Sequence, residues 1–76
     1  MAERMPRITG RELLRALGKA GWERVNQVGS HVHLKHPVRP GRVTVPVHSG
    51  ETLRLGTLRS ILDQAGMTVE ELNKLL

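Results

Sequence analysis

The chain has 76 residues, no cysteine and a formal net charge of +5 at pH 7. This length allows one domain with one modest core, and the absence of cysteine excludes disulfide stabilisation and fits a reducing compartment. Nine of the twelve basic residues are arginine, whose planar guanidinium group binds phosphates through several donors. The composition therefore favours a partner rich in phosphate, such as RNA.

Membrane insertion and secretion are not expected. No apolar run approaches the roughly 20 residues that span a bilayer, and residues 1–7 lack the apolar core of a signal peptide. No repeat, low-complexity segment or long linker interrupts the chain. We therefore expect a cytoplasmic protein with a single domain over residues 1–76.

A first helix is predicted to start at Thr9. Thr9 and Glu12 have the spacing of a capping box, in which each side chain bonds a free backbone N–H of the first turn. Leu13, Leu14 and Leu17 follow as one apolar stripe. Gly21 is a suitable C-terminal stop, because glycine accepts the left-handed conformation.

A first strand is predicted from Trp22 to Gln27, although its apolar and polar residues alternate poorly. Gly29 and Ser30 then indicate a turn, in which Gly29 serves the backbone geometry. Trp22 is the only aromatic residue of the chain, and its position is more typical of a core than of a platform for stacked bases.

Two further strands are predicted over residues 31–36 and 42–47, separated by a loop over residues 37–41. In the first of them Val32 and Leu34 share one face, because successive side chains of a strand point to opposite sides. In the second, Pro46 indicates an edge strand or a strand end, since proline has no N–H for a ladder. The opposite face is predicted to be polar and cationic and carries His31, His33, Lys35, Arg42 and Thr44.

A second helix is predicted from Leu55 to Ala65, where apolar residues recur at helical spacing, and Gly66 should end it. Thr68 and Glu71 repeat the capping-box pattern before a short final helix. The order is α-β-β-β-α with a last turn of helix. It predicts an α+β fold in which a three-stranded antiparallel sheet is covered on one face by helices.

Several short motifs occur in a specific order along almost the whole chain: Leu14 to Leu17, Gly21-Trp22, Gly29-Ser30-His31, Val45-Pro46-Val47-His48, Gly56-Thr57-Leu58, Ile61-Leu62 and Ala65-Gly66. With these motifs the chain resembles the HicA toxin family, also known as YcfA-like proteins. It departs from the family pattern at Trp22, where phenylalanine is common. The resemblance implies a double-stranded-RNA-binding-domain-like fold. It also implies a ribosome-independent mRNA interferase of a type II toxin–antitoxin system, inhibited by a HicB antitoxin.

By this resemblance, His31 corresponds to the catalytic histidine of the Gly-Ser-His motif. A histidine in a metal-free ribonuclease can take the proton of the ribose 2′-hydroxyl as general base. The proton for the leaving oxygen would come from Lys35, His33 or water. No metal or other cofactor is expected, because Glu23 and Glu51 do not complete a zinc-ligand pattern around His31 and His33.

With one aromatic residue, the chain is expected to recognise RNA through its phosphates and 2′-hydroxyl groups rather than by stacking. The candidate RNA-binding residues are Ser30, His33, Lys35 and Arg42, together with Arg11 and Arg15, four positions apart on the first helix. His48 is interpreted as a residue that fixes the turn into the second helix.

Two other hypotheses fit the same residues. The chain would be a non-catalytic RNA-binding module, a vestigial toxin included, if His31 were an ordinary exposed strand residue. It would be a structural or regulatory subunit if it acted only through its antitoxin partner. Turnover of a labelled RNA separates an endoribonuclease toxin from both.

Overall fold

The helices and strands follow one another in the predicted order in the computed structural model, which describes residues 4–76. They are α1 (Gly10–Lys19), β1 (Glu23–Val28), β2 (His31–Lys35), β3 (Arg42–Pro46), α2 (Leu55–Ala65) and α3 (Val69–Leu75). The first three residues of segment 1–7, in which no signal peptide is expected, lie outside the described residues. Over residues 4–76, every helix is too short or too polar to cross a membrane.

Local signals set the helix ends, as the sequence predicts. Thr9 caps α1, and its hydroxyl oxygen accepts from the Glu12 N–H while the Glu12 carboxylate accepts from the Thr9 N–H. Thr68 and Glu71 form the same capping box at α3. Gly66 ends α2 in the left-handed conformation, with φ of 64°, which costs glycine little because it has no Cβ.

The three strands form one antiparallel sheet in the order β1-β2-β3, so that β2 is central. Gly29 and Ser30 join β1 to β2, and Gly29 has φ of 58°, as the first central position of a type II′ turn requires. Pro46 ends the edge strand β3, which confirms the expectation from its missing N–H.

The first strand differs from its prediction. β1 begins at Glu23, one residue after Trp22, whose side chain is 4% exposed and belongs to the core. All six residues of β1 are exposed, and the pairing with β2 shifts between Arg24 and Asn26. The alternation is poor because this edge strand buries neither face and contains an irregularity.

The second strand ends earlier than predicted, because His36 leaves the sheet. The His36 Nδ1 accepts from the backbone N–H groups of Val38 and Arg39, and its Nε2 lies 3.1 Å from the carbonyl oxygen of Ala20. The ring also meets Trp22 edge-on, with centroids 5.3 Å apart. His36 is therefore a structural residue that fixes the β2–β3 loop against the end of α1.

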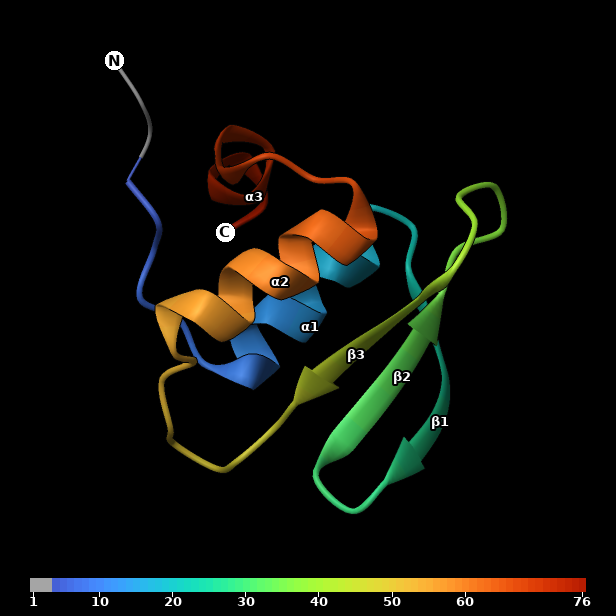
Figure 1. Ribbon diagram of the computed structural model, residues 1–76, viewed down its shortest axis with the longest axis horizontal. Coiled ribbons are helices and arrows are strands. Elements are labelled where there is room, and N and C mark those ends of the chain that lie inside the picture. The colour runs from blue at the N-terminus through green and yellow to red at the C-terminus, as the bar shows by residue number, and fades with distance from the viewer. Residues whose placement is uncertain (1–3) are drawn as a thin grey trace.

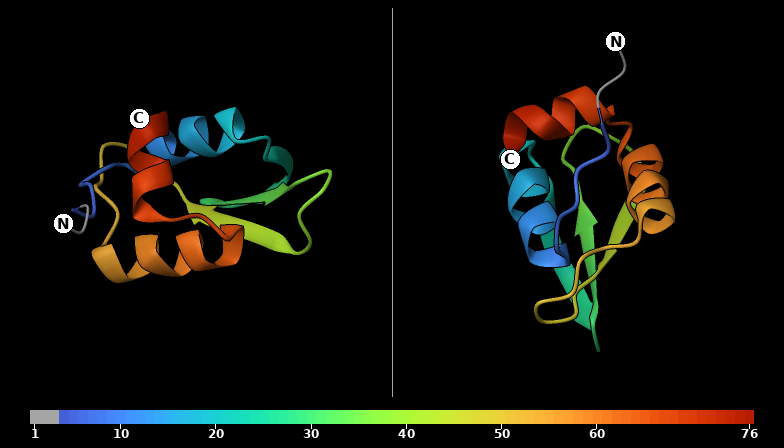
Figure 2. Two further views of the ribbon diagram at one scale, coloured as in Figure 1. Left: turned by 90° about the horizontal axis from the view of Figure 1, so that it is seen from above. Right: turned by 90° about the vertical axis from the view of Figure 1, so that its left-hand side faces the viewer.

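Helices α1 and α2 lie side by side on one face of the sheet, and α3 packs at their far side (Figure 1, Figure 2). Between these layers lies one apolar core, made of Ile8, Leu13, Leu14, Ala16, Leu17, Trp22, Val32, Leu34, Val43, Val45, Leu53, Leu58, Ile61, Leu62, Ala65 and Leu72. The other face of the sheet is open to solvent. The α+β, double-stranded-RNA-binding-domain-like fold is therefore confirmed.

Two long side chains join separate segments of the fold by hydrogen bonds to helix ends. The guanidinium of Arg39, in the β2–β3 loop, donates to the carbonyl oxygens of Ala65 and Gly66 at the end of α2, both at 3.0 Å. The Lys19 ammonium donates to the Leu75 carbonyl oxygen at 3.0 Å and joins α1 to α3. Both contacts satisfy carbonyl groups that a helix end leaves without a partner.

Candidate functional site

The open face of the sheet carries three rows of side chains that run across the strands. Residues paired in an antiparallel sheet point to the same face, so the register defines these rows. They are Val28–His31–Pro46, Asn26–His33–Thr44 and Glu23–Lys35–Arg42. The predicted polar face is thus present, and it holds His31, His33, Lys35 and Arg42 together.

His31 begins β2 at one end of this face, with an exposed side chain. It lines a groove of about 520 Å³ together with Thr44 and Pro46 of β3 and with residues of α2. The α2 wall of the groove consists of Gly56, Thr57, Ser60, Ile61 and Gln64. The hydroxyl and amide groups of this wall are suitable partners for the oxygen atoms of a ribose-phosphate chain.

The four histidines have different surroundings, and this difference singles out two of them. His36 has the structural contacts described above, and the His33 Nδ1 lies 2.9 Å from the Thr44 hydroxyl oxygen. The rings of His31 and His48 form no hydrogen bond within residues 4–76. The His31 ring is therefore free to bond a ligand in the groove.

The remaining candidate RNA-binding residues fall into two groups. Lys35 and Arg42 face each other on the open face, and both are exposed. Arg11 and Arg15 instead belong to α1, on the helical side of the sheet, where Arg11 lies in a hollow with Arg24 and Gln27. The fold does not bring the two arginines of α1 onto the surface that carries His31.

Ser30 contributes to the site through its backbone. Its carbonyl oxygen accepts from the Val47 N–H at 2.7 Å and so holds the segment that follows β3 next to the β1–β2 turn. Gly10 approaches the same segment closely, since a Cβ there would clash with the Pro46 carbonyl oxygen. These contacts position Pro46 beside His31.

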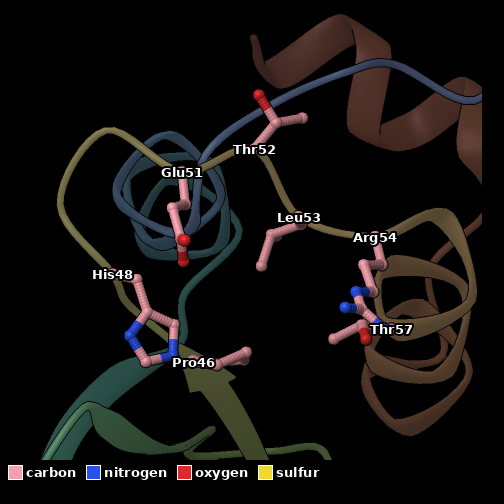
Figure 3. A pocket seen from close by; sticks show the side chains of 7 residues that line it. All are labelled: Pro46, His48, Glu51, Thr52, Leu53, Arg54 and Thr57. Carbon is pink, nitrogen blue, oxygen red and sulfur yellow. The ribbon is translucent and has the colours of Figure 1, made fainter.

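The sequence analysis did not identify the α2 wall or a second hollow at its end. This hollow lies between the β3–α2 loop and the first turn of α2, and Glu51, Arg54 and His48 contribute to it (Figure 3). The motif Gly56-Thr57-Leu58 was the only indication of the α2 wall. Within residues 4–76, no three His, Asp or Glu side chains lie close enough together to hold a metal ion.

A family model described as the HicA toxin of bacterial toxin–antitoxin systems matches residues 10–67. The chain belongs to the HicA toxin family. Membership of the HicA family implies an mRNA interferase of a toxin–antitoxin system. Among curated proteins, none matches the chain significantly.

The HicA match spans α1, the whole sheet and α2, and it includes His31, His48 and both walls of the groove. Helix α3 follows the matched segment. Its residue Leu72 is fully buried, so α3 extends the core of the HicA fold on the side away from the open face (Figure 2).

Proposed function

We propose that the chain is an endoribonuclease toxin that cleaves mRNA on the open face of its sheet, with His31 as general base and without a metal. The observation that carries this proposal is the exposed His31 ring in a groove lined by hydroxyl and amide groups, inside the segment that matches the HicA family. Lys35 and Arg42 on the same face would bind phosphates of the substrate.

The proposed reaction is an internal transesterification. A nitrogen of His31 takes the proton of a ribose 2′-hydroxyl, and the 2′-oxygen attacks the adjacent phosphorus. The bond from phosphorus to the 5′-oxygen breaks, and this oxygen receives a proton from Lys35, His33 or water. The products are a 2′,3′-cyclic phosphate and a 5′-hydroxyl end.

Incubation of the protein with a labelled RNA, with and without excess EDTA, tests the metal independence. The proposal expects equal cleavage in both samples and cyclic phosphate ends on the products. Activity that disappears with EDTA and returns with magnesium would contradict this mechanism. RNA binding without any turnover would instead support the non-catalytic module.

The proposed partner is an antitoxin of the HicB type, and the proposed site of action is the cytoplasm, where mRNA is available. Coexpression with the protein encoded beside the toxin gene tests this partner. We expect the antitoxin to copurify with the toxin and to suppress RNA cleavage. A neighbouring protein that does neither would rule out this partner.

A further inference from the structure

The second hollow has a volume of about 420 Å³ and adjoins the His31 groove. It is lined by Pro46, His48, Glu51, Thr52, Leu53, Arg54 and Thr57. Pro46 and Thr57 also line the groove of His31. The two hollows are thus adjacent, and an RNA strand with its cleaved bond at His31 would place a neighbouring nucleotide at the second hollow.

The loop that forms one wall of this pocket is held firmly by its backbone. The Glu51 N–H donates to the His48 carbonyl oxygen at 3.0 Å and closes a turn in which Gly50 has φ of 74°. The Leu53 N–H donates to the Ile8 carbonyl oxygen at 2.8 Å, and the Leu53 side chain is buried. These bonds hold both ends of the loop that lines the pocket.

Three side chains of the pocket are available to bond a ligand. Within residues 4–76, the His48, Glu51 and Arg54 side chains form no hydrogen bond or ion pair. His48 takes part in the turn through its backbone carbonyl oxygen, whereas its ring forms no hydrogen bond there among the described residues. Figure 3 shows the Glu51 carboxylate and the His48 ring on one side and the Arg54 guanidinium on the other.

The chemistry of the pocket suits a nucleobase better than a phosphate. An ionised carboxylate such as that of Glu51 only accepts hydrogen bonds and repels phosphate oxygens, whereas the Arg54 guanidinium only donates. Between them, Leu53 and Pro46 provide apolar surface for a flat ring. A nucleobase has such an apolar body, with N–H donors and acceptors along its edges.

We propose that this pocket binds the base of a nucleotide beside the cleaved bond and prefers guanine. This inference rests on the proposed function. The N1–H and the amino group of guanine are adjacent donors that match the two carboxylate oxygens of Glu51, and its O6 and N7 are acceptors for Arg54. Adenine, cytosine and uracil lack such a pair of adjacent donors.

The test measures binding, so that it does not depend on turnover. The His31→Ala protein is titrated with short single-stranded RNAs that differ in one base at one position, and each position is scanned in turn. We expect guanine at one position to bind roughly 5- to 150-fold more tightly than the other bases, the range of one bidentate base contact. Adding Glu51→Gln should abolish this preference. Because the variant also removes a negative charge that repels phosphates, the affinities for the other three bases should rise equally.

Two further variants make the result specific. Glu70→Gln makes the same chemical change on the exposed surface of α3 and should preserve the guanine preference. Arg54→Leu should weaken binding of the guanine-containing RNA at the same position. Melting temperatures close to that of the parent protein show that each variant is folded.

Binding with no base preference, a preference for another base, or a guanine preference that survives Glu51→Gln would overturn the pocket assignment. The outcome for the proposed function is separate. A wild-type protein that shows the Glu51-dependent preference but cleaves no RNA would keep the pocket and contradict the ribonuclease. A wild-type protein that cleaves RNA but shows no such preference would support the ribonuclease and contradict the pocket assignment.

Discussion

The two faces of the sheet differ sharply, although the same strands build both. On the face beneath α1 and α2, Val32 and Leu34 of β2 are each 2% exposed. On the open face, His31 and Lys35 of the same strand are exposed. Side chains along the five residues of β2 therefore alternate between the core, where they stabilise the fold, and the open face, where they belong to the proposed site.

The same separation of apolar from polar side chains holds for the whole core. Among the described residues, no polar or charged side chain is buried, so the core offers no group for chemistry. The His31, Lys35 and Arg42 side chains are exposed, so their removal leaves the core intact. Substitutions on the covered face should therefore change stability, and those on the open face should change RNA binding or cleavage.

The largest effect on stability is expected from Leu34→Ala, beneath the helices. Truncation of a buried leucine costs about 2–5 kcal/mol, against a total of roughly 4–11 kcal/mol for a domain of 76 residues. Urea denaturation should show this loss. A matched truncation on the open face, Val28→Ala, should cost less than about 1 kcal/mol, because Val28 is 62% exposed. Equal losses in both variants would disprove the separation of the faces.

The next effect concerns the salt dependence of RNA binding. If about four phosphates are bound, the slope of log affinity against log salt for a single strand should be near −3, since each contact contributes about 0.7. Lys35→Ala and Arg42→Ala should each make this slope less steep by about 0.7, the contribution of one phosphate contact. Lys74→Ala, a control on α3 beside Glu70, should leave it unchanged. A slope near zero in the wild type would remove the argument for phosphate binding.

The smallest effect is the acid sensitivity of the two capping boxes. Hydrogen bonds from the Thr9 and Thr68 N–H groups lower the pKa of Glu12 and of Glu71 from the usual 4.5. Their stabilisation is thus complete above pH 4.5 and is lost as the pH falls through the folded-state pKa. The Glu12→Gln/Glu71→Gln protein should lose less melting temperature than the wild type between about pH 6 and about pH 3. Parallel curves would refute this role.

Features encoded by neighbouring residues were predicted well from the sequence. Both capping boxes, the Gly29-Ser30 turn and the end of α2 at Gly66 depend on local geometry, and all are present. The two faces of β2 follow from alternation. The predicted start of β1, at Trp22, was wrong by one residue, because this exposed edge strand has no alternation of apolar and polar residues in its sequence.

The site was only partly predictable, because it depends on contacts between distant segments. His31 was found through its motif, whereas the α2 wall with Ser60 and Gln64 arises only when α2 packs beside β3. The sequence placed Arg15 off the apolar stripe of α1, but it could not show that this helix lies on the side opposite the open face. The role of Arg11 and Arg15 in RNA binding stays a prediction.

The most direct test compares His31, the first residue of β2, with His36, which follows the strand. His31→Ala should reduce RNA cleavage by about 10²–10⁴-fold, change stability by less than about 0.5 kcal/mol and preserve RNA binding. His36→Ala should lower stability by about 1–3 kcal/mol, since it removes the hydrogen bonds of the loop and the contact with Trp22. Its folded molecules should still cleave at the wild-type rate. Cleavage at the wild-type rate by His31→Ala, or its unfolding, would contradict the assignment of catalysis to the open face.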